Sequence, residues 1–355
     1  MKQDVPDQLK AEMNASRERL REKKPLVYDK LMQYLEKEKQ GIEPALSLLD
    51  WAYGFECNFR CPHCCADTFR NRKIKANLSI PEIRNMSEQI DQLGIFIINL
   101  IGGEPLVWKN LDEIIAALDP QKFHISLTTN GWLLDQKKAF ELAKLGVDKV
   151  GISIDSGIEA EHDLFRNQKG SYEKTVAAVD NAKRAGIRTM ISTVVTHQNI
   201  RSDGFKRLIE LSLEKDVTLD LQCATVSGGW RGNHEVLINA EDAAYLEGLR
   251  EKYPLLRRDV WSVPGSAGGC PAVTRSMYII PTGDVLPCLF IHVSFGNIKE
   301  EALEVILGRM LKVKEFTDFS GICLAGEDMT FINKYLSKTY VTDDLPLSYE
   351  TVFKA

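Results

Sequence analysis

The regular alternation of apolar runs with helical segments between residues 48 and 223 constrains the fold of this 355-residue chain more than any other feature. Apolar runs bounded by turn residues predict strands, and segments with apolar residues at helical spacing predict the helices between them. Strands that alternate with helices form parallel βα units with right-handed crossovers. The chain is therefore predicted to be α/β, with a partial (βα)6 TIM-like barrel. The predicted strands are 48–53, 95–101, 123–129, 147–154, 187–195 and 217–223, and the predicted helices between them are 79–94, 110–118, 135–145, 171–185 and 202–214.

The loop after the first predicted strand holds three cysteines, Cys57, Cys61 and Cys64, within eight residues. Thiolates hold iron–sulfur clusters, usually four to a cubane, so three ligands in one loop leave one iron open for chemistry. A zinc knuckle or a group of packed thiols is the alternative interpretation. Zinc sites normally pair C-x2-C with a second Cys or His pair, and no such pair follows nearby.

Glycine-rich and polar motifs follow the predicted strands, at the ends where parallel strands gather functional residues. Glycines let the backbone approach a ligand closely, and the planar fork of an arginine such as Arg166 suits a carboxylate. On sequence alone, residues 102–105 are equally compatible with a turn and a cap, and Thr129 and Asn130 with a turn at a helix start. The loop that begins at Ser227 is equally compatible with a plain surface loop, and Arg166 with a solvated cation on a helix face. The motifs are Gly102-Gly103-Glu104-Pro105, Thr129-Asn130-Gly131, Ser153-Ile154-Asp155-Ser156 and Ser227-Gly228-Gly229-Trp230.

The C-x3-C-x2-C spacing, with His63 just before the third cysteine, resembles the signature of the radical S-adenosylmethionine (SAM) superfamily. The resemblance implies a catalytic 4Fe-4S cluster whose open iron binds the methionine end of SAM. It also implies reductive cleavage of SAM to a 5'-deoxyadenosyl radical that abstracts hydrogen from a substrate. The alternative class of function is a non-catalytic iron–sulfur or zinc-binding scaffold protein.

The resemblance carries specific roles to the matching positions of this chain. The cluster ligands implied are Cys57, Cys61 and Cys64. The residues implied to bind SAM are His63 near the adenine, Gly102, Gly103 and Glu104 at the methionine amino group, and Ser153, Asp155 and Arg166 at its ribose hydroxyls and carboxylate.

A second group of cysteines lies late in the chain. Twelve residues separate Cys270 from Gly283, and four separate Gly283 from Cys288. This spacing is similar to the opening of the SPASM and twitch modules, which bind auxiliary iron–sulfur clusters. Strand 277–280, a turn at 281–284 and strand 285–290 form a predicted hairpin that brings the two cysteines together. Cys323, after a predicted helix from residue 300 to about 316, supplies a third ligand.

The late cysteines are too few for two auxiliary clusters, so the resemblance implies one second 4Fe-4S cluster. The resemblance to twitch modules implies that three cysteine ligands suffice and that the free iron faces substrate. Alternatively, Glu327, Asp328 or another cysteine completes the cluster. Packing of Cys270, Cys288 and Cys323 as small hydrophobic residues is the alternative.

Cys223 ends the sixth predicted strand and is expected to face the cavity where the radical forms. A thiol there can donate a hydrogen atom to a substrate radical, as in radical epimerases of the superfamily. Filling of core volume is the alternative role.

The predicted organisation is an N-terminal helical extension (1–45), the barrel (46–234), a SPASM/twitch-like cluster module built from a hairpin and a helix (235–330) and a C-terminal tail (331–355). The extension carries helical periodicity but no secretory signal, and no apolar run has transmembrane length, so a cytoplasmic protein is predicted. A net charge of −5 gives no general attraction to nucleic acid or an anionic membrane.

The resemblance also implies partners and a range of reactions. Flavodoxin or ferredoxin is the expected reductant. The expected substrate is a peptide or a small molecule that undergoes oxidation, epimerisation or bond formation.

Overall fold

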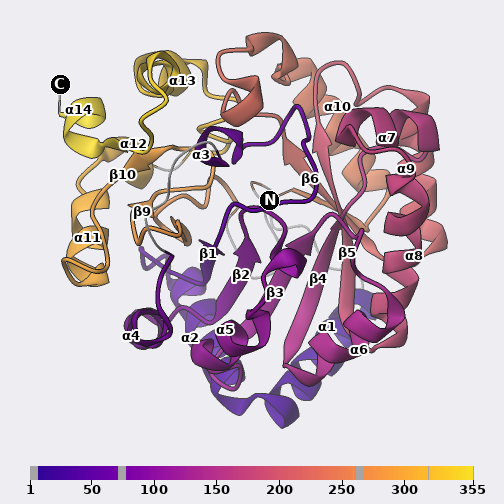
Figure 1. Cartoon of the computed structure of the whole chain (residues 1–355), viewed down its shortest axis with the longest axis horizontal. Coiled ribbons are helices and arrows are strands. Elements are labelled where there is room, and N and C mark those ends of the chain that lie inside the picture. Colours follow the sequence, from indigo (N-terminus) through magenta and orange to yellow (C-terminus); the bar gives the residue numbers. More distant parts are fainter. Residues whose placement is uncertain (1–6, 71–76, 259, 261–267, 319, 355) are drawn as a thin grey trace.

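The computed structural model describes residues 7–70, 77–258, 260, 268–318 and 320–354. In this part of the chain nine strands form one sheet, in the order β7-β6-β5-β4-β3-β2-β1-β8-β9, and every neighbouring pair is parallel except β8 and β9. Helices cover the outer face of the curved sheet (Figure 1). The predicted α/β class and partial barrel are confirmed, with strands added at both edges. The predicted domain boundaries stay predictions.

The six predicted strands and the helices between them are present, within about two residues of the predicted bounds. The strands are β1 (Leu48–Ala52), β2 (Ile97–Ile101), β3 (His124–Thr129), β4 (Val147–Ser153), β5 (Arg188–Val195), β6 (Thr218–Cys223), β7 (Leu256–Arg258), β8 (Ser276–Ile279), β9 (Val285–Leu286), β10 (Val293–Ser294) and β11 (Leu347–Ser348). The α-helices are α1 (Asp7–Lys23), α2 (Pro25–Gln40), α3 (Asp67–Arg70), α4 (Ile80–Gln92), α5 (Leu111–Leu118), α6 (Gln136–Lys144), α7 (Glu159–Arg166), α8 (Ser171–Arg184), α9 (Asp203–Glu214), α10 (Ala240–Lys252), α11 (Leu303–Met310), α12 (Lys314–Thr317), α13 (Met329–Lys334) and α14 (Tyr349–Phe353). Short 3-10 helices are η1 (Pro105–Val107), η2 (Gly228–Trp230), η3 (His234–Val236) and η4 (Leu336–Val341).

The predicted hairpin is present, but its second strand ends at Leu286 and not at residue 290, and the hairpin is part of the barrel sheet. Strand β8 pairs in parallel with β1 and antiparallel with β9. The late cysteines are therefore anchored to the same sheet as the early ones. None of the described helices combines the length and apolar character that a membrane crossing needs.

The helix predicted from residue 300 to about 316 is wrong as one element. Residues 311–313 separate α11 from α12, where the Val313 amide hydrogen bonds to the Met310 carbonyl in a tight turn at 3.0 Å. The helical spacing of apolar residues continues across this turn because both short helices bury one face, Met310 on α11 and Phe316 on α12. Periodicity alone therefore did not reveal the break.

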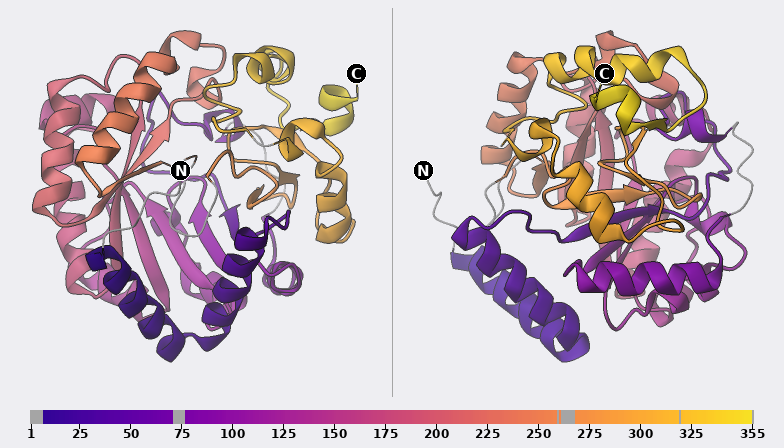
Figure 2. Two further views of the ribbon diagram at one scale, coloured as in Figure 1. Left: turned by 180° about the vertical axis from the view of Figure 1, so that it is seen from behind. Right: turned by 90° about the vertical axis from the view of Figure 1, so that its left-hand side faces the viewer.

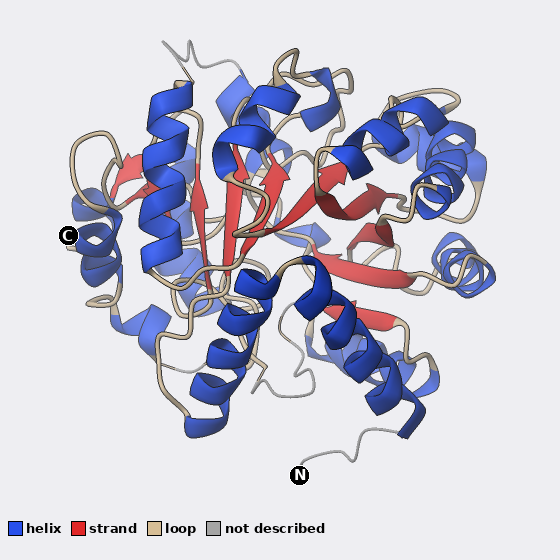
Figure 3. Cartoon of the chain, turned by 90° about the horizontal axis from the view of Figure 1, so that it is seen from below, coloured by secondary structure: helices blue, strands red, loops and turns tan. Residues whose placement is uncertain are grey.

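The two N-terminal helices lie outside the sheet, at the end where the strands begin (Figures 2 and 3). Lys24 at their junction is buried, and its ammonium donates to the Phe123 carbonyl at 3.0 Å and the Gly146 carbonyl at 3.2 Å. The same group pairs with the Asp148 carboxylate at 2.5 Å. One cation thus satisfies backbone acceptors ahead of two strands and joins the helices to the barrel.

Replacing Lys24 tests this attachment. Lys24→Met keeps an apolar side chain but removes the cation paired with Asp148, which keeps the Ile125 amide as a donor, and it removes the donor to two carbonyls. The free energy of unfolding should therefore fall by about 3 kcal/mol. Lys23→Met, at an exposed neighbouring position, should change it by less than about 0.5 kcal/mol. Urea denaturation followed by circular dichroism measures both. Equal, small effects for the two variants would contradict the role given to Lys24.

His292 joins the C-terminal segment to the barrel. Its ring is 2% exposed, lies 4.5 Å from the Phe69 ring and bonds through Nε2 to the Leu289 carbonyl. Burial lowers the pKa of His292 to about 4. The ring is therefore neutral in the folded chain at pH 5.5, while it is mostly protonated in the unfolded chain.

This difference makes stability depend on pH. The unfolded chain binds a proton at His292 below about pH 6.5, whereas the folded chain does not. The contribution of neutral His292 to the free energy of unfolding is therefore complete above that pH and is lost as pH falls toward 4. Between pH 7.5 and 5.5 His292 should lower the free energy of unfolding by about 1.3 kcal/mol. His292→Gln should reduce the measured difference in this free energy between the two pH values by that amount. Urea denaturation of the iron-free chain at both pH values tests this. His234→Gln, at an exposed position, serves as the control; an identical pH difference in His292→Gln and the natural chain would refute the assignment.

Candidate active site

The cysteine loop follows β1 at the carboxyl edge of the sheet, and its neighbours come from the next strands along that edge. Asn130, after β3, donates to the Asn58 side chain at 2.8 Å and lies 4.0 Å from the Cys57 sulfur. Burial, followed by smaller effects that include Cys61, raises the pKa of Cys57 to about 11. Burial and then neighbours that include Cys64 also raise the pKa of Cys61. The three thiols are therefore electrostatic neighbours in a partly desolvated loop.

Two arginines donate to this loop. Arg70 donates to the Cys64 sulfur at 3.4 Å and to the Phe59 carbonyl at 3.1 Å. Arg166 hydrogen bonds to Cys61. Cationic donors at the sulfurs favour the thiolate form, which is the form that binds metal.

The Gly102-Gly103-Glu104 motif lies against the chain segment that leads into the cysteine loop. A Cβ on Gly103 would come within 2.0 Å of the Glu56 carbonyl oxygen, and one on Gly102 within 2.7 Å of the Gly54 carbonyl oxygen. The amides of Gly103 and Glu104 donate to the same two carbonyls. The glycines are therefore required by packing within the chain, in addition to any approach to a ligand.

Glu104 is 1% exposed and faces the end of β3. Its carboxylate accepts from Thr129 Oγ1 at 2.6 Å, the Asn130 amide at 2.8 Å and the Leu106 amide at 3.1 Å. Burial nevertheless raises the pKa of Glu104. The carboxylate is thus held in one orientation, and a cationic ligand group beside it would stabilise its charged form in this buried site.

Arg166 is not a solvated helix-face cation, so that alternative is wrong. Its side chain is 12% exposed, and its Nε donates at 2.5 Å to Asp155, whose side chain is 1% exposed. The second Asp155 oxygen accepts from the Val194 amide at 2.9 Å. Burial alone would lower the pKa of Arg166, but Asp155 and Cys61 raise it above its usual range. Ser153 is half-buried at the end of β4, beside Ser192 of β5.

An aromatic cluster covers the loop. The His63 ring stacks on Phe165 with ring centroids 4.2 Å apart and lies 5.6 Å from Trp230. His63 Nδ1 is buried without a hydrogen-bond partner among the described residues. Phe165 was missed because it is distant in sequence from the cysteines, whereas Trp230 belongs to the predicted 227–230 motif. An unsatisfied buried nitrogen fits a site where a polar ligand group, such as a purine ring, would complete the hydrogen bonding.

The loop 227–230 is part of this site and not a plain surface loop. The Gly229 amide donates to the Cys64 carbonyl at 3.0 Å. A Cβ on Gly228 would lie 2.1 Å from the same carbonyl oxygen. The two glycines in Ser227-Gly228-Gly229-Trp230 were the available signal of this close approach.

The late cysteines also come together. Cys323 has neighbours that include Cys270 and Cys288, which add to the effect of burial in raising its pKa well above the usual range. The Cys270 amide donates to the Ser320 carbonyl at 2.9 Å, which fixes Cys270 beside the segment that carries Cys323. In the described chain no three His, Cys, Asp or Glu side chains converge closely enough to hold a single metal ion. The ligands of an iron–sulfur cubane need not converge on one point, because each thiolate binds a separate iron of the cluster.

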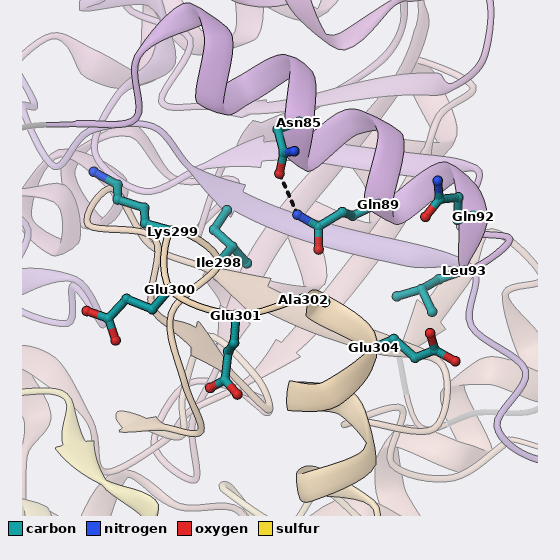
Figure 4. Close-up of a pocket in the computed structure, with 10 residues that line it drawn as sticks. All are labelled: Asn85, Gln89, Gln92, Leu93, Ile298, Lys299, Glu300, Glu301, Ala302 and Glu304. Carbon is teal, nitrogen blue, oxygen red and sulfur yellow. Dashed lines mark hydrogen bonds between the residues drawn. The ribbon is translucent and has the colours of Figure 1, made fainter.

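A surface hollow between α4 and α11 is separate from both cysteine groups (Figure 4). It has a volume of about 510 Å³ and contains none of the predicted site residues. Its lining is mostly polar and charged: Asn85, Gln89, Gln92, Leu93, Ile298, Lys299, Glu300, Glu301, Ala302 and Glu304.

Two family models match the chain at these two sites. The model of the radical SAM superfamily matches residues 52–210, and a model described as an iron-sulfur cluster-binding domain, SPASM, matches residues 270–326. The two matched ranges contain all six predicted cluster ligands.

Relatives with related chemistry resemble most of the chain. An AdoMet-dependent heme synthase of Nitratidesulfovibrio vulgaris is 24% identical over 79% of this chain and 84% of its own. The mycofactocin maturase MftC of Mycolicibacterium smegmatis is 26% identical over 74% of this chain and 70% of its own.

A solved structure of Streptococcus suis SuiB bound to precursor peptide SuiA has the same fold, with a TM-score of 0.60 and 15% identity over 79% of this chain and 69% of that one. The interpretation as a non-catalytic scaffold has no comparable support. The chain belongs to the radical SAM superfamily: it is a radical SAM enzyme with a SPASM-type iron–sulfur module, and its cofactors are SAM and 4Fe-4S clusters.

Proposed function

We propose that Cys57, Cys61 and Cys64 hold the catalytic cluster. The observation that carries this assignment is the grouping of three thiols in one loop at the carboxyl edge of the sheet, with arginine donors at two of the sulfurs. Three thiolates satisfy three irons of a cubane and leave the fourth for SAM. When bound, the reduced cluster supplies the electron that cleaves SAM to methionine and the 5'-deoxyadenosyl radical.

The surrounding residues orient SAM and exclude water. Glu104 accepts from the methionine amino group, and Arg166 donates to the carboxylate while remaining fixed by Asp155. Asp155 pairs with Arg166 and accepts from the Val194 amide, so we assign it a positioning role that holds the Arg166 guanidinium. Ser153 would contact the ribose of bound SAM. His63, which stacks on Phe165 and lies near Trp230, would contact its adenine.

Cys270, Cys288 and Cys323 hold the auxiliary cluster. Strand β8, which follows Cys270, pairs with β1, which leads into the catalytic cysteines. The two clusters are therefore connected through one pair of neighbouring strands. This arrangement suits an electron acceptor for a substrate radical.

The substrate is a peptide or a small molecule, and flavodoxin or ferredoxin is the reductant. Similarity to MftC and to the fold of peptide-bound SuiB supports a peptide. Similarity to the heme synthase supports a small molecule, here a tetrapyrrole. Product analysis after incubation with a precursor peptide or an iron porphyrin distinguishes the two, since only the true substrate should increase 5'-deoxyadenosine and change mass.

The catalytic cysteines provide the first functional test. Anaerobically reconstituted protein should produce 5'-deoxyadenosine from SAM and dithionite, and alanine at Cys57, Cys61 or Cys64 should reduce the rate at least about 100-fold, because one ligand of the cluster is lost. Cys65→Ala, at the adjacent thiol, should retain activity within about twofold. Equal rates in Cys61→Ala and Cys65→Ala would rule out the assigned ligand set. Zinc without acid-labile sulfide in the purified protein would support a scaffold instead.

Asp155 provides a test of SAM positioning. Asp155→Asn should keep the iron content but raise the KM for SAM by about 10- to 100-fold, because Arg166 is no longer held in one orientation. Asp203→Asn, whose side chain is 81% exposed, is the matched control. Steady-state 5'-deoxyadenosine formation gives kcat and KM separately. A fall in kcat with an unchanged KM would show that Asp155 does not act through SAM binding.

A further inference from the structure

Cys223 lies beside the auxiliary cysteine Cys323 in the structure, although the two are far apart in the sequence. A Cβ built on Gly326 would lie 3.5 Å from the Cys223 Cβ and 3.6 Å from the Cys323 sulfur. The two cysteines therefore flank the same glycine. Cys223 is also the last residue of β6, so a barrel strand brings it to the segment that follows the module's helices.

The electrostatic environment of Cys323 points to the same grouping. After burial, the neighbours that raise the pKa of Cys323 are Cys270, Cys223 and Cys288, in that order, followed by Glu327. Three other thiols are thus electrostatic neighbours of Cys323. Four thiolates are the usual ligand set of a cubane.

Arg258 determines how Cys223 can act. The guanidinium is 4% exposed and donates to the Cys223 sulfur at 2.8 Å and to the Glu327 carboxylate at 2.7 Å. Arginine has only donors, so the sulfur is the acceptor of this bond. A buried cation next to the sulfur favours a thiolate, which binds iron, over a protonated thiol, which would donate a hydrogen atom.

The other predicted candidates for the fourth ligand are already engaged. Glu327 accepts from the Cys323 amide at 3.0 Å with the oxygen that also pairs with Arg258. Asp328 caps α13 by accepting from the Phe331 amide at 2.9 Å. Both carboxylates organise the backbone around Cys323.

We propose that Cys223 is the fourth thiolate ligand of the auxiliary cluster held by Cys270, Cys288 and Cys323. This inference rests on the proposed auxiliary site, and it replaces the predicted hydrogen-donor role of Cys223. Four thiolates leave no iron open, so substrate does not bind to this cluster directly. The cluster is then suited to electron transfer, with its potential influenced by the Arg258 hydrogen bond.

The test uses the full chain with Cys57, Cys61 and Cys64 all changed to alanine, so that only the auxiliary cluster remains. After anaerobic reconstitution this background should bind about four irons. Adding Cys223→Ala should leave one iron without a protein ligand, so that mild oxidation removes it and leaves about three irons with the electron paramagnetic resonance signal of an oxidised three-iron cluster. Cys65→Ala in the same background should keep about four irons and the original spectrum. Circular dichroism checks that each variant is folded.

Cys223→Ser keeps the test decisive if the alanine variant does not fold. A serine oxygen can replace the thiolate, so about four irons should remain but the reduced spectrum should change. A serine variant with the spectrum of the background, or an alanine variant with four irons and that spectrum, would overturn the ligand assignment. If the triple-alanine background itself binds no iron–sulfur cluster, the auxiliary site fails, which is distinct from failure of Cys223 alone.

Discussion

The buried ion pair between Arg166 and Asp155 is the contact on which the arrangement of the catalytic face depends. It joins the end of α7 to the segment after β4, and Asp155 extends the connection to Val194 of β5. The same guanidinium hydrogen bonds to Cys61. A buried charge pair is stable only when its hydrogen bonds are satisfied, and here the surrounding elements supply them. A change in any one of these elements therefore moves the cysteine loop.

Close backbone packing completes the same face. The glycines at 102 and 103 lie against the segment before the cysteine loop, and Gly228 and Gly229 lie against its far end. A side chain at these positions would collide with carbonyl oxygens. The loop is thus held from two sides by glycine-containing turns that follow different strands. Its geometry is fixed before any cofactor binds, as expected for a site that must orient SAM.

The sequence predicted much of this structure because its main signals are local. Apolar runs defined β1 to β6, and two apolar runs on either side of the turn at 281–284 predicted the hairpin. Contacts between distant segments had no such signal. Arg258 and Phe165 follow unremarkable local patterns, yet Arg258 reaches Cys223 and Phe165 stacks on His63. Cys223 was expected at the end of its strand, but its neighbours depend on how the C-terminal segment returns to the barrel.

The central claim is that one chain holds two iron–sulfur clusters at separate cysteine groups on one sheet. Anomalous X-ray diffraction at the iron edge, from crystals of the anaerobically reconstituted protein, tests it most directly. The account predicts two separate groups of iron peaks, one at Cys57, Cys61 and Cys64 and one at Cys270, Cys288 and Cys323. A fully reconstituted protein without iron at the first group, or with iron at only one of the two, would contradict it.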